Sequence, residues 1–276
     1  NVHAWARKAR DAEAELRIIS PPDTRHRGAS WNEEILTAID ASTGIVSLPT
    51  VHWTDGTVFD LVEVSRRCRE VGAALVVDGT QSLGALPFNV TLVRPDVLMC
   101  SGYKWLLGPY SVSLTYFGAR FDHGEPLEET WIGRENSENF EHLPDYKAGY
   151  QPGAIRYDVA QRSNFALLPV AVASLELITK WRPDRIQTYC MDLTDDFFEE
   201  VEELGFTVED ARWRSGHLFG VRMPKELKLV ELQQILKARG VSVSLRGSAL
   251  RVSPNLYNNA EDVSALLEGL REAVAD

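Results

Sequence analysis

The chain has few cysteines and a deficit of positive charge. Its 276 residues include three cysteines, Cys68, Cys100 and Cys190, which are widely spaced and odd in number. This spacing argues against a disulfide framework, and the lack of a CxxC or cysteine–histidine pattern argues against a metal site. Lys and Arg number 29 against 40 Asp and Glu, for a net charge of -11. Nucleic acids and anionic membranes bind clustered positive charge, so neither is expected as a partner.

Long apolar runs and nucleotide-binding loops are also missing. No apolar run approaches the roughly 18 residues that a membrane span needs, and no signal peptide is expected at the start. Together with the cysteine usage, this predicts a cytoplasmic location. No GxGxxG or GK[ST] loop follows an apolar run, which argues against a nucleotide-binding βαβ protein.

Between residues 15 and 96 the sequence alternates short β-rich runs with amphipathic helical runs. In order, these runs are ELRIIS, WNEEILTAID, TGIVSLPTV, FDLVEVSRRCREVG and AALVVD. Such alternation predicts an α/β fold with a mainly parallel sheet, and the nearly continuous apolar strands indicate helices on both faces. Two further strands are predicted from DVLMCS and SVSLTYFG.

The second half of the chain predicts a change of domain. After an irregular stretch over residues 119–153, the run NFALLPVAVASLELITKW predicts a helix that is apolar nearly all round and hence buried between two parts of the structure. The string KWRPD breaks that helix, so we expect a large domain over residues 1–182 and a smaller C-terminal α+β domain over residues 183–276.

Polar side chains gather where two predicted strands end. The strand ALVVD ends in Asp78 and is followed by Gln81, while DVLMCS ends in Ser101 and is followed by Lys104. Ligands of open α/β sheets bind at the carboxyl ends of the strands, so these side chains are expected to share one crevice. A lysine forms an imine with an aldehyde, and a carboxylate holds a proton on a pyridine nitrogen. The set therefore suits pyridoxal 5'-phosphate as a cofactor.

The strings VVDGTQSLGALPFNV and CSGYKWLLGP resemble the class V aminotransferase family of fold type I pyridoxal phosphate enzymes. This family includes cysteine desulfurases, kynureninases and isopenicillin N epimerases. The strings LPTVHWTDGTVFDL, RYDVAQRSNF and ALRVSPNLYNNAEDV look like further blocks of the family in the family's order, so the resemblance covers essentially the whole chain. It implies a small amino acid as substrate and a homodimer with a shared site.

The resemblance also implies roles for individual residues. Lys104 matches the Schiff-base lysine, Asp78 the partner of the pyridinium nitrogen and Arg251 the arginine that binds the substrate's α-carboxylate. The remaining cofactor contacts that it implies are Gln81 to the ring phenolate oxygen, Ser101 to the phosphate, Thr80 against the ring face, His52 as a polar neighbour, and Gln161 to the phosphate across the dimer.

Three features depart from the family pattern. The chain opens on Asn1 with no block for a phosphate-cradling loop, so we expect the family's N-terminal part to be missing. Ala160 stands where relatives often have Gly, which restricts φ. Tyr103 replaces the histidine that desulfurases place before the lysine, and no cysteine lies in the segment ahead of Arg251, which argues against persulfide chemistry.

The leading expectation is an aminotransferase-like enzyme that acts on a small amino acid through Lys104. Two alternatives stay open: an epimerase or a C–S or C–C lyase with the same cofactor, and a catalytically silent, truncated homologue. Taken alone, Lys104 could also be a snorkelling side chain, and Asp78 an ordinary turn or helix-cap residue.

Overall fold

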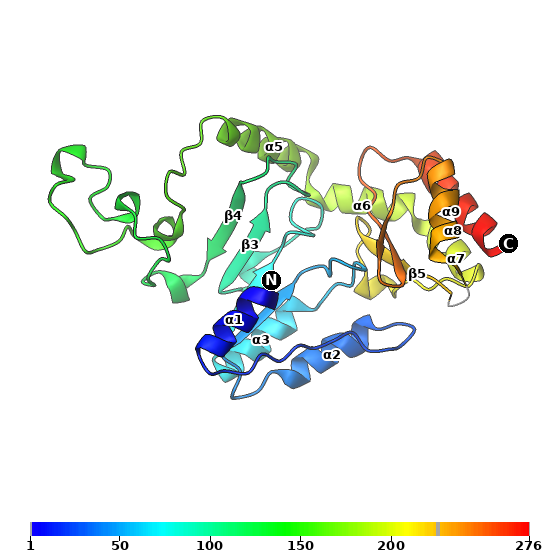
Figure 1. Ribbon diagram of the computed structural model, residues 1–276, viewed down its shortest axis with the longest axis horizontal. Helices are drawn as coiled ribbons and strands as arrows, with labels where there is room; N and C mark the ends of the chain where they lie inside the picture. The colour runs from blue at the N-terminus through cyan, green and yellow to red at the C-terminus, as the bar shows by residue number, and fades with distance from the viewer. Residues whose placement is uncertain (1, 225–226, 276) are drawn as a thin grey trace.

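The central sheet has the strand order β1-β2-β3-β4 in the computed structural model, which describes residues 2–224 and 227–275 (Figure 1). Its strands are β1 (Ile45–Pro49), β2 (Ala74–Asp78), β3 (Val97–Ser101) and β4 (Ser113–Phe117). The first three run parallel, and β4 runs antiparallel to β3. The predicted mainly parallel sheet is therefore confirmed.

Two helices, α2 (Gly28–Ala38) and α3 (Leu61–Val71), pack on one face of this sheet. In α3 the buried residues Leu61, Val64, Ser65 and Cys68 recur at helical spacing and form one buried, mainly apolar stripe. The short helix α4 (Val90–Val93) leads into β3. On the other face, α1 (Val2–Asp11) contacts β1, because Trp5 Nε1 donates to Ser47 Oγ at 3.0 Å.

The strand predicted over residues 15–20 is wrong. This segment is irregular, and its polar groups bond to α2 and the residues just after it rather than to a neighbouring strand. Ile19 O accepts from Trp31 Nε1 at 3.0 Å, and Arg17 Nη1 donates to Ala38 O at 2.8 Å. The segment therefore lies against α2 and the residues after it instead of joining the sheet.

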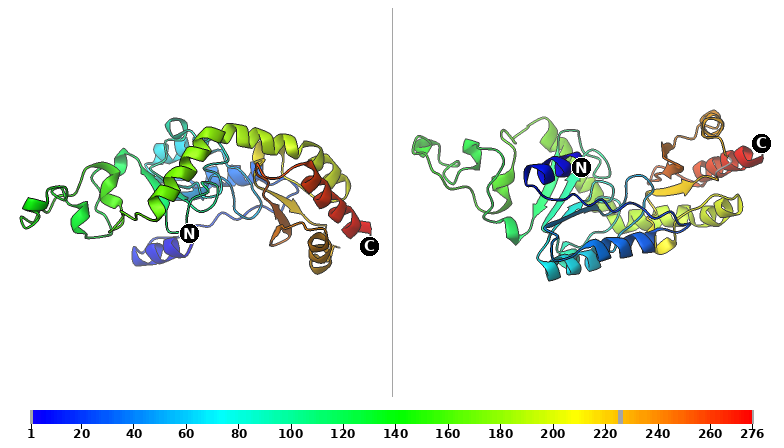
Figure 2. Two further views of the ribbon diagram at one scale, coloured as in Figure 1. Left: turned by 90° about the horizontal axis from the view of Figure 1, so that it is seen from above. Right: turned by 60° about the horizontal axis from the view of Figure 1, so that its bottom comes forward.

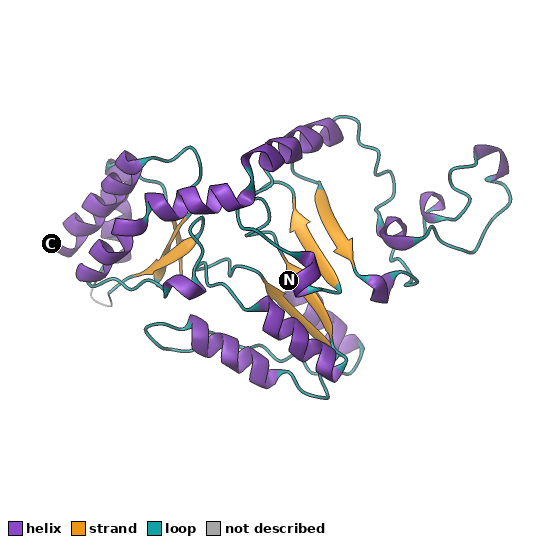
Figure 3. Cartoon of the chain, turned by 180° about the vertical axis from the view of Figure 1, so that it is seen from behind, coloured by secondary structure: helices purple, strands orange, loops and turns teal. Residues whose placement is uncertain are grey.

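Residues 119–153 form the predicted irregular stretch, which extends away from the sheet (Figure 3). It contains the short 3₁₀ segments η1 (Ala119–Phe121), η2 (Trp131–Gly133) and η3 (Phe140–His142), and η4 (Gly153–Tyr157) follows it. A surface hollow of about 900 Å³ is lined by residues of this stretch alone.

The apolar helix of the second half is α5 (Leu167–Trp181), with Pro169 in its first turn. Its predicted burial between two parts of the structure is wrong. Only Ala171, Ser174 and Ile178 are buried, while Val172 is 52% exposed. The helix packs along one stripe, since apolar composition does not determine what lies beside a helix.

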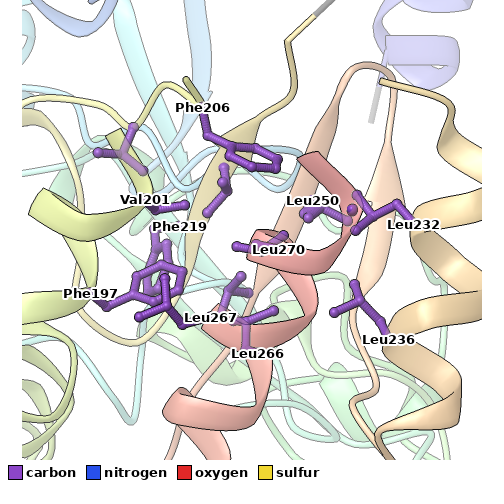
Figure 4. Close-up of a cluster of buried hydrophobic side chains, with 14 residues drawn as sticks. Phe197, Val201, Phe206, Phe219, Leu232, Leu236, Leu250, Leu266, Leu267 and Leu270 are labelled. Carbon is purple, nitrogen blue, oxygen red and sulfur yellow. The ribbon is translucent and has the colours of Figure 1, made fainter. Parts of the chain in front are cut away.

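Helix α6 (Pro183–Leu193) starts within the KWRPD string; we call the chain from α6 onward the smaller unit and the part before it the large unit. The other elements of the smaller unit are α7 (Asp195–Glu203), η5 (Ala211–Trp213), β5 (Phe219–Arg222), α8 (Leu229–Ala238), β6 (Ser244–Arg246), β7 (Ala249–Val252) and α9 (Ala260–Ala275). The three strands form an antiparallel sheet in the order β5-β7-β6. Phenylalanine, leucine and valine side chains fill the space between this sheet and helices α7, α8 and α9 (Figure 4).

A third apolar cluster joins the two units. It contains Ala85 from the turn after β2, Ile178 from α5, and Ile186 and Cys190 from α6, with Trp105 packed against it. Figure 2 shows α5 and α6 following one another from the central sheet to the smaller unit. Among the helices of the described residues, none is long and apolar enough to cross a membrane.

Candidate active site

The carboxyl ends of β2 and β3 lie side by side, as predicted. Asp78 ends β2, and its Oδ1 accepts from the Thr80 backbone N–H at 2.9 Å. Thr80 Oγ1 in turn accepts from the backbone N–H of Ser101, the last residue of β3, at 3.2 Å. The structure therefore brings Asp78, Thr80 and Ser101 together through bonds between the two strand ends.

The turn that carries Lys104 is packed against the turn after β2. Gly84 has φ 105, and a Cβ on it would lie 2.2 Å from the carbonyl oxygen of Trp105. Only glycine allows so close a backbone approach at such a φ. The residue next to Lys104 is thus fixed against the turn that begins at Asp78.

Lys104 lies within electrostatic reach of groups from both units. Burial lowers the pKa of its ammonium group, and the positive charges of Arg251 and Arg246 lower it further, while the Asp78 carboxylate acts in the opposite direction. The Nζ atom also lies 5.7 Å from the centre of the Tyr103 ring. These shifts favour the neutral amine of Lys104 more than water would favour that of an exposed lysine.

Arg251 comes from the smaller unit, on β7. Its Nη1 donates to the carbonyl oxygen of Trp53 at 2.9 Å, and Trp53 belongs to the loop after β1. Burial and the charge of Arg246 lower the pKa of Arg251. The candidate site therefore lies where the two units meet.

His52 lies in a turn that bonds mainly to itself. Its Nδ1 is 2.7 Å from Thr54 Oγ1 and 3.0 Å from Asp55 Oδ1, and its ring meets the edge of Trp31 at 4.8 Å. Burial and the charge of Arg27 lower the pKa of His52 to about 4. His52 is thus a neutral residue of this turn, and no contact joins it to Lys104 among the described residues.

Gln161 is exposed on the loop ahead of α5. Its φ is 56, so the left-handed backbone conformation falls on Gln161 itself rather than on Ala160. The Ala160 N–H donates to the Glu128 carboxylate at 2.6 Å. Within this one chain, as far as the structure describes it, Gln161 contacts none of the other predicted site residues.

Three further residues near the site were not singled out from the sequence. His217 donates from Nε2 to the backbone carbonyl of Gln81 at 2.7 Å, and its ring meets Trp105 at 4.6 Å. Thr50 follows β1, and its Oγ1 is buried without a hydrogen-bond partner among the described atoms. Arg246 contributes to the electrostatics of Lys104. For Arg246 a sequence signal existed, namely its place in a tight hairpin with Arg251.

The three cysteines are free and buried. Burial is the first cause of their raised pKa values, which are about 11 for Cys68, about 12 for Cys100 and about 11 for Cys190. A thiol is a poor nucleophile without its thiolate form, so these residues do not supply the persulfide chemistry of a desulfurase.

Comparisons with known proteins give the family and the fold of the chain. A family model described as aminotransferase class V matches residues 1–266. The isopenicillin N epimerase of Streptomyces clavuligerus is 24% identical over 275 residues, which cover 96% of this chain and 69% of that protein. The kynureninase of Geobacillus thermodenitrificans is 24% identical over 255 residues, which cover 88% of this chain and 58% of that protein.

A solved structure shows the same fold. The cysteine desulfurase CsdA of Escherichia coli superposes with a TM-score of 0.78 at 17% identity, covering 100% of this chain and 69% of that chain. This places the chain among the fold type I structures. The chain spans between 58% and 70% of the length of the curated relatives compared with it.

Proposed function

The chain belongs to the class V aminotransferase family, and we propose that it is a pyridoxal phosphate-dependent enzyme acting on a small amino acid. Members of this family depend on that cofactor. The observation that carries the proposal is the position of Lys104. Its amine lies at the carboxyl edge of the sheet, with a lowered pKa, in reach of the Asp78 carboxylate and the Arg251 guanidinium.

The groups at this edge fit the cofactor. Pyridoxal phosphate, when bound, supplies an aldehyde that reacts with amines and a ring that accepts electron density from the substrate's α-carbon. The edge provides one amine, one carboxylate and the hydroxyl groups of Thr50, Thr80 and Ser101. Thr50 Oγ1 is buried and without a partner among the described residues, as expected of a hydroxyl that awaits a ligand.

Each residue has a stated task in this proposal. Lys104 holds the cofactor through Nζ and, as a neutral amine, moves the proton at the substrate's α-carbon. Asp78 accepts a hydrogen bond from the protonated ring nitrogen. Arg251 binds the α-carboxylate, for which the planar guanidinium is well shaped.

Transfer of the amino group is the activity that we propose first. Relatives of this chain include an epimerase, kynureninases and a probable cysteine desulfurase. Epimerisation and bond cleavage use the same proton transfer at the α-carbon, so they remain the alternatives. The buried cysteines with raised pKa values argue against desulfurisation.

Reductive trapping tests the proposal. The purified chain is mixed with pyridoxal phosphate, its visible absorbance is recorded, and borohydride reduction is followed by peptide mass mapping. We expect a visible band and a label on Lys104. Lys104→Arg keeps a long basic side chain but has no reactive amine and should lose both, while Lys180→Arg, on α5, should keep both. Absence of the band, or a label on another lysine, would contradict the proposal and favour the catalytically silent alternative.

We also propose that the protein acts as a homodimer. Gln161 lies on an exposed loop and contacts no other predicted site residue in its own chain, within the described residues. Its implied role at the phosphate therefore needs a second copy. Light scattering that gives a single-chain mass at micromolar concentration, with and without cofactor, would contradict this part.

A further inference from the structure

The hairpin formed by β6 and β7 places two arginines on one face. Arg246 pairs with Ala249, and Ser244 pairs with Arg251. Paired residues share a face, and so do residues two apart in a strand. Arg246 and Arg251 are therefore diagonal neighbours, with Cα atoms roughly 7–8 Å apart.

One tryptophan lies against both arginines. Arg251 Nη1 donates to the Trp53 carbonyl oxygen at 2.9 Å, and the Arg246 guanidinium carbon lies 5.7 Å from the centre of the Trp53 ring. The loop that carries Trp53 approaches β5 closely at Gly56, whose φ is 73 and where a Cβ would lie 2.1 Å from the Leu218 carbonyl oxygen. The two arginines thus face a fixed wall of the large unit.

Neither guanidinium group has an anionic partner among the described residues. Arg246 Nη1 donates to the carbonyl oxygen of its neighbour Leu245 at 2.7 Å. The Nε atoms of Arg246 and Arg251 are both buried without a hydrogen-bond partner, and no ion pair involves either arginine in the part of the chain that the structure describes. A buried charged donor left without a partner is costly, which favours binding of an anion.

The local charge is opposite to that of the whole chain. Arg246 and Arg251 lie within electrostatic reach of one another, whereas the chain has a net charge of -11. Clustered cations repel one another and focus a positive potential into the crevice. One α-carboxylate supplies one negative charge, to Arg251, and leaves Arg246 unmatched.

We propose that Arg246 determines specificity by binding a second acidic group of the substrate, so that the site prefers dicarboxylic amino acids and their 2-oxo acids. This rests on the proposed function, in which Arg251 binds the α-carboxylate. A four- or five-carbon diacid is long enough to reach both arginines on this face. A neutral amino acid leaves the Arg246 Nε without a partner.

Calorimetry on the cofactor-free chain tests this independently of catalysis. Succinate and glutarate are titrated against butyrate, which has one carboxylate. We expect the diacids to bind roughly 10- to 100-fold more tightly, as for one additional charge-assisted hydrogen-bonded pair. Arg246→Gln should remove this preference without changing butyrate affinity, and Arg246→Lys should retain part of it. Arg212→Gln, at an exposed arginine on η5, should behave as the unaltered chain.

Three outcomes would overturn the inference. The first is equal affinity for diacids and butyrate, and the second is a diacid preference that survives in Arg246→Gln. The third is a loss in Arg246→Gln of affinity for inorganic phosphate and pyridoxal phosphate alone, which would make Arg246 a phosphate ligand. Trapping at Lys104 without diacid preference refutes this inference alone, whereas diacid preference without trapping refutes the proposed catalytic function alone.

Discussion

The two walls of the candidate site differ in how their polar groups are satisfied. On the large unit, the ends of β2 and β3 bond to each other, with Thr80 accepting from the Ser101 N–H and donating to Asp78. On the smaller unit, Arg246 and Arg251 each keep a buried Nε without a partner among the described residues.

The first wall, formed by the ends of β2 and β3, is therefore preformed. The second wall, formed by Arg246 and Arg251, is completed by a ligand. Groups that bond to one another hold their geometry before any ligand arrives, whereas unsatisfied donors gain their partners on binding. Substitutions in the first wall should therefore reduce the free energy of unfolding. Substitutions in the second should mainly change ligand binding.

The largest expected effect is at Gly84. Gly84→Ala adds a Cβ 2.2 Å from the Trp105 carbonyl oxygen at φ 105, so the two turns must separate. We expect the free energy of unfolding to fall by about 3 kcal/mol or more in urea denaturation.

Gly72→Ala is the matched control for that substitution. Gly72 also has a positive φ, 78, but a Cβ there meets nothing within 4 Å. It should cost only about 1 kcal/mol, from backbone strain alone. Equal losses in the two variants would show that the turn contact at Gly84 is not what fixes the first wall.

The next largest effect is the pH dependence of stability through His217. This side chain is completely buried and supports the first wall from the smaller unit, and burial lowers its pKa from 6.5 to about 4. The folded protein therefore holds His217 in its neutral form. The contribution of His217 to the free energy of unfolding is fully present above pH 6.5. It is lost as the pH falls from 6.5 toward 4, by about 3 kcal/mol in total.

Urea denaturation at several pH values, on the unaltered chain and on His217→Gln, isolates this contribution. Glutamine keeps a donor for the Gln81 carbonyl but does not titrate. The variant should lose less stability between pH 7 and pH 4, although His52, whose pKa is also lowered to about 4, keeps its share of the dependence. Parallel pH curves for the two proteins would mean that His217 is not the titrating group.

A smaller effect is expected at Thr80. Thr80→Val removes the Oγ1 that accepts from the Ser101 N–H, at nearly constant volume. One hydrogen bond lost between half-buried groups costs about 1 kcal/mol. Thr179→Val is a control, because its hydroxyl only bonds back to Leu175 O within the exposed part of α5. If the free energy of unfolding falls no more in Thr80→Val than in Thr179→Val, the hydrogen bond between the strand ends does not stabilise the first wall.

The sequence predicts the first wall well and the second only in part. Asp78, Ser101 and Lys104 follow apolar runs that could only be buried strands, and parallel strands bring their carboxyl ends to one edge. Arg246 was also within reach, because a two-residue Gly247–Ser248 turn fixes the register and hence the shared face with Arg251. That register argument needs no knowledge of the rest of the fold.

Other features depend on contacts that no local pattern encodes. His217 bonds to Gln81 across 136 residues, and nothing in the string GHLFG distinguishes it from an ordinary strand residue. The strand predicted from ELRIIS failed because this segment bonds to Trp31 and Ala38 of α2, contacts that the run itself does not encode. The prediction that α5 is buried failed because the sequence pattern of a helix shows which face can be buried, not which faces other elements cover.

The smallest expected effect is at Arg251, and it tests the second wall most directly. Arg251→Met loses one hydrogen bond to Trp53 O but also removes a buried Nε without a partner and the repulsion with Arg246. These terms oppose each other, so stability should change by less than about 0.5 kcal/mol.

Arg214→Met is the control from the same unit, since Arg214 is equally half-buried but well satisfied. Its guanidinium lies 3.7 Å from the centre of the Phe198 ring, donates to the Glu209 carbonyl and is near the carboxylates of Glu202 and Asp210. Removing it should cost about 2 kcal/mol. If Arg251→Met is as destabilising as Arg214→Met, then Arg251 is a structural residue, and the second wall is already satisfied without a ligand.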